Sequence, residues 1–282
     1  MDVEAYLAEH SARVDRFLEA QVPPADAEPG RLHAAMRHLL FPGGKRFRPV
    51  LALAAARAVG GDPEVALPVA AAVELIHTYS LVHDDLPCMD DDALRRGRAT
   101  VHVAFDEATA VLAGDALLAE AFRVMLSAGE LPPAVRLEAA RELAHAAGSR
   151  ELVGGQADDL VPGEGAPTAA RIESVHARKT AALIRAAVVA GGRVAGGSPA
   201  TLERLGRFAA AVGLGFQIAD DLLDRDEGHG PEACSLVTVL GSEGARARAE
   251  ALLAEALAEI EGLGEAAEPL RELARMAVRR TH

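Results

Sequence analysis

The sequence contains no tryptophan and few other aromatic residues, with two tyrosines and seven phenylalanines among 282 residues. β-Branched residues occur in short, scattered runs instead of the alternating pattern that half-buried strands require. Alanine and leucine recur throughout, and both favour helices. Hydrophobic residues make up 50% of the chain, which is enough for one large core. The sequence therefore predicts an all-α protein with a single domain over residues 1–282.

Cysteine is scarce as well. Only Cys88 and Cys234 occur, and neither belongs to a CxxC pair, which argues against a disulfide framework and against a zinc-thiolate site. The first twenty residues are charged and amphipathic and lack the apolar core of a signal peptide. No later segment combines the length of a membrane span with freedom from charge. We therefore expect a soluble, cytoplasmic protein with no membrane span.

Basic residues are outnumbered, because 29 lysines and arginines face 42 aspartates and glutamates, for a formal net charge of -13. Such a charge repels nucleic acid in general, so we expect no nucleic-acid partner. The chain also lacks the GxxxxGK(S/T) loop and the GxGxxG turn that cradle nucleotide phosphates. The few basic clusters that do occur are therefore candidates for binding a different anion.

Short breakers rich in glycine and proline, such as "PPADAEPG" and "VPGEGAPT", separate segments of helix length. None of them is long or low in complexity, so the sequence shows no linker to a second domain. No repeat has a period used by solenoid proteins. An acidic pattern does occur twice, and it is the first sign of chemistry.

Each acidic cluster follows a long apolar run, and the clusters are Asp84, Asp85 and Asp90 in "YSLVHDDLPCMD" and Asp220, Asp221 and Asp224 in "FQIADDLLD". A lone aspartate pair most often belongs to a solvated helix face. Here the apolar runs would carry the carboxylates inward, where uncompensated charge is costly. Carboxylates without nearby cysteine or paired histidine suit Mg²⁺, which needs only one or two of them when phosphate oxygens complete its coordination. The clusters therefore predict Mg²⁺ and a phosphate-bearing substrate.

The spacing within each cluster favours shared ions. Asp220 and Asp224 are four residues apart, so they share one face of a helix. On an unbroken helix Asp90 would point away from Asp84, but Pro87 interrupts regular geometry and can let the chain turn back. We therefore expect Asp84 and Asp90 to bind the same ions.

Three basic clusters can supply the positive charge that two diphosphates need. Each cluster alone would more often be a solvated loop. In the first, glycines let the backbone approach a ligand. The clusters are Lys45, Arg46 and Arg48 in "GGKRFRP", Arg95 and Arg96 in "LRRGR", and Lys179 in "HARKT".

Six motifs along nearly the whole chain resemble, in order and spacing, those of the trans-isoprenyl diphosphate synthases, and most closely the bacterial farnesyl diphosphate synthases. They are "GGKRFRP", "IHTYSLVHDDLPCMDDDALRRGRATVH", "AVLAGDALLAEAF", "GGQADDL", "HARKTAALI" and "FQIADDLLD". The resemblance implies the isoprenoid synthase fold, a large helical bundle around a deep apolar cavity, and a homodimer. It also implies Mg²⁺-dependent, head-to-tail condensation of isopentenyl diphosphate with an allylic diphosphate, dimethylallyl or geranyl, to give mainly farnesyl diphosphate.

The resemblance also assigns residue roles. It implies Mg²⁺ binding by all six clustered aspartates, with Asp84, Asp90 and Asp220 as direct ligands. The residues expected near the allylic diphosphate are Arg95, Lys179 and Gln217, and those expected at the isopentenyl diphosphate site are Lys45, Arg48, His77 and Arg96. Further motif positions that line the cavity are Thr180, Gln156 and Asp159. With the three direct ligands, the predicted catalytic residues are Arg95, Lys179 and Thr180, and Thr180 is also counted among the substrate-binding residues.

Tyr79 lies five residues before Asp84, about 7.5 Å deeper at the usual helical rise of about 1.5 Å per residue. In the resembled family an aromatic residue here, beside the two-residue-longer aspartate motif, goes with a farnesyl product. Ser80 is too small to block the cavity by itself. We therefore expect this pair of residues to set chain length, with a geranylgeranyl diphosphate synthase as the alternative.

The sequence departs from the family pattern after the second acidic cluster. The loop "RDEGHGPEACSLVTVLG" is short and places Ala233 where the family usually has lysine. Ala93 and Ala99 also replace the usual aspartate and proline. The missing lysine keeps a terpene cyclase-like enzyme, or a weakly active member of the family, open as alternatives.

A distant alternative is a di-iron helical bundle, which uses two Glu-x-x-His pairs together with further glutamates. Three such pairs occur here, at Glu74/His77, Glu142/His145 and Glu173/His176. Chance pairs are expected in a helical chain rich in both residues. This alternative also leaves both acidic clusters and "GGKRFRP" unexplained.

Overall fold

The computed structural model describes residues 1–161, 168–226 and 235–280. Within these ranges every regular element is helical except one two-stranded hairpin, β1 (Leu94–Arg95) and β2 (Arg98–Ala99). The prediction of an all-α protein is confirmed. The chain separates into two compact units. Unit 1 comprises Met1–Val3, Leu51–Ala66 and Arg141–His282, and unit 2 comprises Glu4–Val50 and Leu67–Ala140. This division into units does not test whether the chain is one domain, so the single domain over residues 1–282 stays a prediction.

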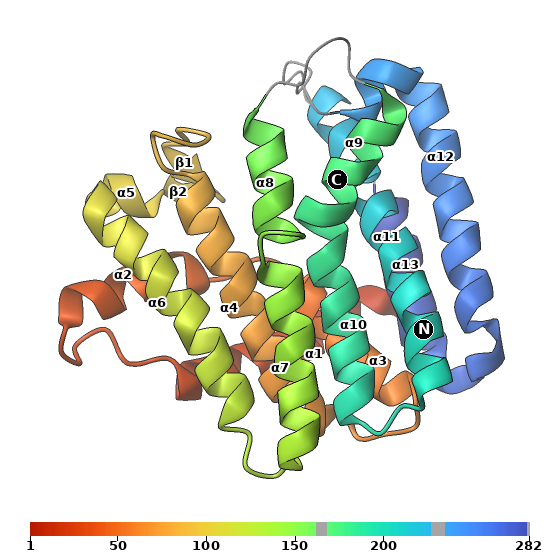
Figure 1. Ribbon diagram of the computed structural model, residues 1–282, viewed down its shortest axis with the longest axis horizontal. Helices are drawn as coiled ribbons and strands as arrows, with labels where there is room; N and C mark the ends of the chain where they lie inside the picture. Colours follow the sequence, from red (N-terminus) through yellow and green to blue (C-terminus); the bar gives the residue numbers. More distant parts are fainter. Residues whose placement is uncertain (162–167, 227–234, 281–282) are drawn as a thin grey trace. The chain divides into compact units, whose positions relative to one another are not determined.

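Unit 2 is organised around α4 (Leu67–Asp84), which is apolar on nearly every face and lies beside α6 (Glu107–Leu126), as Figure 1 shows. A helix that is hydrophobic all round is expected in a core. Gly114 allows the close approach, because a Cβ there would lie 2.1 Å from Nε2 of His83 on α4. The same His83 nitrogen donates to the carbonyl of Val111 at 3.0 Å. The remaining helices of this unit are α1 (Val3–Gln21), α2 (Gly30–Leu40), α5 (Val101–Ala104), the start of α3 (Phe47–Ala58) and the start of α7 (Pro133–Ala147).

Unit 1 is organised around the long helix α11 (Pro199–Asp226), which packs against α10 (Ala182–Val194), α12 (Leu236–Ile260) and α13 (Glu268–Val278). These helices run side by side in Figure 1. Gly241 has a φ of 70° and interrupts α12 near its start. The remaining elements of the unit are the rest of α3 and of α7, α8 (Leu152–Leu160), α9 (Ala169–His176), a π-helical turn η2 (Ala177–Ala181), and three 3₁₀ turns, η1 (Pro63–Ala66), η3 (Glu261–Leu263) and η4 (Glu265–Ala267).

The segment Pro63–Asp84 is the one helix in the described ranges that is long and apolar enough to cross a membrane by length and composition. In the structure 67% of its most apolar window is buried. A buried core helix passes the same test as a membrane span, so this single helix is weak evidence for one.

Candidate active site

The chain turns back on itself directly after α4. The backbone N–H of Asp85 still donates to the carbonyl of Leu81 at 3.1 Å, so the helical pattern continues for one residue past Asp84. Beyond Pro87 the N–H of Asp90 donates to the carbonyl of Asp84 at 2.8 Å. The predicted turn at Pro87 is therefore confirmed. It places the backbone of Asp90 against that of Asp84, and binding of Mg²⁺ by these two residues stays a prediction.

Asp85 faces the protein interior and holds Arg95. Its side chain is completely buried, and Oδ1 accepts from Nε and Nη2 of Arg95 at 2.9 and 2.6 Å. Nη2 of Arg95 also donates to Asp92 at 2.7 Å. Burial raises the pKa of Asp85, and Arg95 opposes that rise. Burial lowers the pKa of Arg95. The hydrogen bond from Arg95 to Asp85 and the attraction of the Asp85 charge outweigh this effect, so the pKa of the guanidinium is raised overall. Asp85 therefore fixes the position of a cationic group beside the first acidic cluster.

The β1–β2 hairpin presents Arg95 and Arg96 next to that cluster. Its two turn residues, Arg96 and Gly97, have φ values of 54° and 72°, as a tight two-residue hairpin turn requires. Gly44 lets the neighbouring loop approach, since a Cβ there would lie 2.8 Å from the guanidinium carbon of Arg96. Burial lowers the pKa of Arg96, Glu74 opposes this effect, and the nearby guanidiniums of Arg46 and Arg95 add to it.

Arg46 anchors the "GGKRFRP" loop from within. Its side chain is completely buried, and its backbone has a φ of 50°. Nε donates to Asp15 at 2.8 Å, Nη1 to Glu74 at 2.5 Å and Nη2 to the carbonyl of Leu40 at 2.5 Å. Gly43 is required here, because a Cβ would lie 1.9 Å from the guanidinium carbon. Arg46 therefore shapes the loop, whereas Lys45 is exposed on it.

Arg48 and His77 lie together. Nη1 of Arg48 is 3.5 Å from Nε2 of His77. Burial lowers the pKa of His77 well below its usual value, and the positive charges of Arg48, Arg96, Arg46 and Arg95 lower it further. His77 is therefore neutral at physiological pH, which leaves the arginines as the charged groups of this cluster.

Unit 1 holds the second set of predicted residues on the π-helical turn η2 and on α11. Such turns are frequent at functional sites. Nζ of Lys179 lies 2.5 Å from Asp159 Oδ2, and the Thr180 hydroxyl donates to Gln217 Oε1 at 2.9 Å. The Gln217 amide donates in turn to Asp221 Oδ1 at 3.1 Å. This chain of hydrogen bonds fixes the orientation of the hydroxyl and the amide.

The aspartates of the second cluster have different surroundings. Asp221 is buried, and its Oδ2 accepts from the backbone N–H of Leu236 at 3.2 Å, at the start of α12. Asp220 instead forms an ion pair with Arg280, whose guanidinium also donates to the carbonyl of Phe216 at 3.1 Å and lies 4.0 Å from the centre of that ring. Asp224 is exposed one helical turn beyond Asp220.

Sequence reasoning missed Arg280. It lies 60 residues after Asp220, outside the six motifs, and the only signal for it was a pair of arginines in the segment "VRRTH" of an acidic chain.

Gln156 is 6% exposed, and neither atom of its amide has a hydrogen-bond partner within the described residues. Its neighbour Gly155 lets α8 approach η2, because a Cβ at this glycine would lie 2.3 Å from the backbone nitrogen of Lys179. The structure therefore places Gln156 beside the turn that carries Lys179 and Thr180.

The carboxylates suit a metal ion that is bound together with a phosphate. Among the described residues no group of three His, Cys, Asp or Glu side chains gathers to hold a metal by itself. Mg²⁺ does not require such a group, since one or two carboxylates are enough when phosphate oxygens and water fill the remaining positions. Asp84 with Asp90, and Asp220 with Asp224, offer hard oxygen donors in that number. The residues therefore fit Mg²⁺ that arrives with a diphosphate.

The three Glu-x-x-His pairs have structural surroundings. Each glutamate forms an ion pair with an arginine, and these pairs are Glu74–Arg46 at 2.5 Å, Glu142–Arg185 at 2.7 Å and Glu173–Arg248 at 2.8 Å. A di-iron site would need these carboxylates as ligands. The ion pairs account for the positions of the three glutamates without a metal. The structure therefore favours the interpretation that the Glu-x-x-His spacing recurs by chance.

Tyr79 is buried within α4, with 5% of its surface exposed. Its hydroxyl has no hydrogen-bond partner in the part of the chain that the structure describes, and its ring lies edge-on to His83 at 5.9 Å. Burial, with the nearby charge of Asp84, raises the pKa of Tyr79 to about 12. Ser80 donates to the carbonyl of His77 at 2.9 Å.

Ala233, which the sequence places where the family usually has lysine, lies outside the described residues.

Comparisons with known proteins agree with these motifs. The family model for polyprenyl synthetase matches residues 29–229. Farnesyl diphosphate synthase of Bacillus subtilis is 40% identical over 291 residues, covering 99% of this chain and 98% of that protein. A chloroplastic geranylgeranyl pyrophosphate synthase of Arabidopsis thaliana is 47% identical over 226 residues, covering 79% of this chain and 65% of that protein, so the match spans less than two thirds of the plant relative.

The crystal structure of an FPP/GFPP synthase from Zymomonas mobilis, in its apo form, matches with a TM-score of 0.90 and 40% identity, over 98% of this chain and 99% of that one. Relatives named for farnesyl and for geranylgeranyl products therefore both match. The order of the motifs, the all-helical structure and the family model give one conclusion, which is that the chain belongs to the polyprenyl synthetase family.

Proposed function

We propose that the protein is a soluble, cytoplasmic, Mg²⁺-dependent prenyltransferase that condenses isopentenyl diphosphate with dimethylallyl or geranyl diphosphate, and that farnesyl diphosphate is its main product. The observation that carries the proposal is the end of α4. There Asp84 and Asp90 are brought together by the backbone, and Arg95 is fixed beside them by Asp85. Carboxylates for a metal next to a guanidinium held in place are what a diphosphate leaving group requires.

The charged residues divide into groups that suit two diphosphates. Arg95 and Lys179 are each held by an aspartate and would bind the allylic diphosphate. Arg48, Arg96 and the exposed Lys45 would bind isopentenyl diphosphate, with neutral His77 as a hydrogen-bonding partner. Mg²⁺ bound to the acidic clusters with substrate would stabilise the negative charge that develops on the departing diphosphate.

The other described groups would guide the carbon chemistry. When the allylic carbon–oxygen bond breaks, the aligned oxygens of Thr180 and Gln217 would stabilise the carbocation, and buried apolar walls such as that around Tyr79 would keep it from water. The isopentenyl double bond then forms the new carbon–carbon bond, and the proton lost from the product goes to the departed diphosphate. No side-chain nucleophile is required.

Incubation with Mg²⁺, isopentenyl diphosphate and each allylic primer tests the proposal. We expect diphosphate release and, after dephosphorylation, farnesol as the main alcohol. Hydrocarbon or cyclic alcohol products from an allylic diphosphate alone would instead indicate a cyclase, and no product with any primer would indicate a subunit that needs an active homologue. Purified protein with stoichiometric iron and visible absorbance would support the di-iron alternative.

The length of the product should depend on Tyr79. The change Tyr79→Ala removes a buried ring one and a half turns before Asp84, and we expect it to shift output from farnesyl toward geranylgeranyl diphosphate. Chromatography of the dephosphorylated products measures the shift. Tyr6→Ala is the matched control, because Tyr6 is the only other tyrosine and is also buried, against His10 on α1. A profile in which Tyr79→Ala still makes only farnesyl diphosphate would place the floor of the cavity elsewhere.

A homodimer is part of the proposal, and unit 2 offers a surface for it. Large hydrophobic side chains are exposed on α5 and α6, namely Val103, Val111, Leu112 and Leu126, at 52%, 41%, 57% and 48%. Exposed large apolar side chains on adjoining helices offer apolar surface that a protein partner can bury. We expect the dimer to bury this surface.

The change Leu112→Glu should shift the protein from dimer to monomer, because it would place a charge in an apolar interface. Sedimentation velocity measures the change in mass. Val239→Glu, at an exposed position on α12 of unit 1, serves as control and should leave the dimer intact. A dimer that survives Leu112→Glu would remove α6 from the proposed interface.

A further inference from the structure

Asp220 and Asp221 are neighbours in the second acidic cluster, but they are held by groups of different charge. Asp221 accepts hydrogen bonds from two uncharged donors, the Gln217 amide at 3.1 Å and the backbone N–H of Leu236 at 3.2 Å. Asp220 Oδ1 is instead paired with Nη2 of Arg280, which lies just beyond the end of α13. The carboxylate that the proposed function assigns to Mg²⁺ is therefore the one that a protein cation neutralises.

Two further contacts hold Arg280 at this carboxylate. Its Nη2 donates to the carbonyl of Phe216 at 3.1 Å, and its guanidinium carbon lies 4.0 Å from the centre of the Phe216 ring. Phe216 is one helical turn before Asp220 on α11, so it holds the guanidinium on the same side of the helix. The side chains of Arg280 and Asp220 are 19% and 35% exposed, so water only partly screens their attraction.

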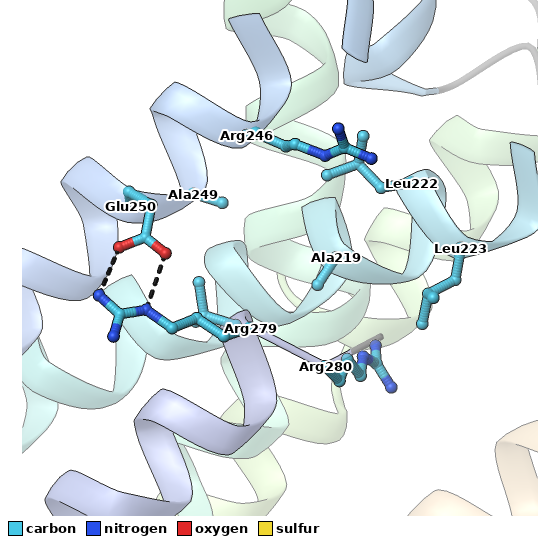
Figure 2. Close-up of a pocket in the computed structure, with 9 residues that line it drawn as sticks. Ala219, Leu222, Leu223, Arg246, Ala249, Glu250, Arg279 and Arg280 are labelled. Carbon is cyan, nitrogen blue, oxygen red and sulfur yellow. Dashed lines mark hydrogen bonds and ion pairs between the residues drawn. The ribbon is translucent and has the colours of Figure 1, made fainter. Parts of the chain in front are cut away.

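The backbone that carries Arg280 is itself anchored. Its neighbour Arg279 donates to both carboxylate oxygens of Glu250 on α12, at 2.8 and 2.7 Å, and the Arg279 N–H donates to the carbonyl of Arg275 at 2.9 Å. Figure 2 shows the side chains of Arg279 and Arg280 pointing in opposite directions from the end of α13. A cation tethered in this way has a high effective concentration at its carboxylate, so it can compete with metal ions in solution.

We infer that Arg280 is a built-in counter-ion of the second acidic cluster, which competes with Mg²⁺ for the Asp220 carboxylate. The inference rests on the proposed role of Asp220 as a Mg²⁺ ligand. Because the guanidinium occupies one Asp220 oxygen and repels other cations, Asp220 can bind a metal ion only at the cost of this ion pair. Arg280 is then a positioning residue that lowers the affinity of the cluster for Mg²⁺.

Binding of Mn²⁺, a divalent ion that also prefers oxygen ligands, tests the competition without substrate or turnover. Electron paramagnetic resonance measures the unbound ion, and a background with Asp84→Asn and Asp90→Asn removes the predicted ligands of the first cluster. Adding Arg280→Gln to this background should tighten Mn²⁺ binding about three- to tenfold, as the loss of one partly screened competing charge predicts. Arg280→Lys keeps the charge and should stay close to the affinity of the background.

Arg207→Gln is the matched control, because it removes the same charge from a more distant site. Arg207 lies on α11, about 20 Å along the helix from Asp220, and pairs with Glu203 and Glu259. In the same background it should leave Mn²⁺ binding unchanged. Equal tightening by Arg207→Gln and Arg280→Gln would reflect net charge alone and would overturn the inference.

The sign of the change separates competition from structural support. If Arg280 only held Asp220 in the orientation that binds a metal, Arg280→Gln would weaken Mn²⁺ binding, and this result or an unchanged affinity would overturn the inference.

Asp220→Asn in the same background tests the metal assignment separately, and it should weaken Mn²⁺ binding. An Asp220→Asn variant that binds Mn²⁺ as tightly as the background would remove Asp220 from the metal ligands, and the inference would fail with that assignment. Binding that depends on Asp220 but is not tightened by Arg280→Gln would overturn the inference alone.

Discussion

Replacement of Asp84 or Asp220 by alanine is expected to lower turnover by about 10²- to 10³-fold or more, because each change removes a carboxylate that would hold Mg²⁺ against the charge of the leaving diphosphate. The fold should survive. Both residues are only partly buried, and each lies near the end of its helix, so neither supports the core. Product formation under saturating substrate and Mg²⁺ measures the effect, and circular dichroism verifies the helical content.

Asp115→Ala is a suitable control, since Asp115 is an exposed carboxylate on α6 and belongs to neither acidic cluster. It should retain wild-type turnover. Near wild-type activity in either Asp84→Ala or Asp220→Ala would contradict the assignment of the acidic clusters to Mg²⁺.

The neighbouring carboxylates should behave differently, and the structure explains why. Asp85 and Asp221 have the same residue type and nearly the same position in their motifs as Asp84 and Asp220. They are buried, however, and bind protein groups. Oδ1 of Asp85 accepts from the guanidinium of Arg95, and Oδ2 of Asp221 accepts from the backbone N–H of Leu236. We infer that they act chiefly by positioning those groups. Asp85→Asn would then disturb Arg95 while leaving the oxygens of Asp84 and Asp90 in place.

Local patterns were sufficient to predict the helices and the turn after α4. Alanine-rich, weakly aromatic segments specify helices through propensity and burial, and Pro87 disrupts the helical pattern at a defined point. The return of Asp90 to Asp84 follows from that local rule, and it was anticipated for this reason. Candidate residues could be named because acidic and basic clusters stand out against an apolar background.

The division of roles within the clusters could not be predicted, because it depends on contacts between distant residues. Asp85 meets Arg95 only through the β1–β2 hairpin, and Asp220 meets Arg280 across 60 residues. Arg46 looked like a member of a phosphate-binding cluster together with Lys45 and Arg48. Its backbone φ of 50° turns it away from the direction that sequence spacing suggests, and its side chain is buried against Glu74.

The pair of Arg46 and Glu74 should be among the most important polar interactions for stability. The side chains are 0% and 3% exposed, so either charge left alone would be buried without its partner. We expect Glu74→Ala to lower the free energy of unfolding by about 3–5 kcal/mol, the usual effect of breaking a buried ion pair from one side. Urea denaturation followed by circular dichroism measures this change.

A second pair and a double variant complete the experiment. Glu19→Ala breaks the more exposed pair between Glu19 and Arg37, and it should cost about 1 kcal/mol or less. Arg46→Met combined with Glu74→Leu removes both charges and should cost less than the sum of the single changes, because no buried charge is left unpaired. If Glu74→Ala were as mild as Glu19→Ala, water would have to reach Arg46, and the loop that carries Lys45 and Arg48 would be anchored by other contacts.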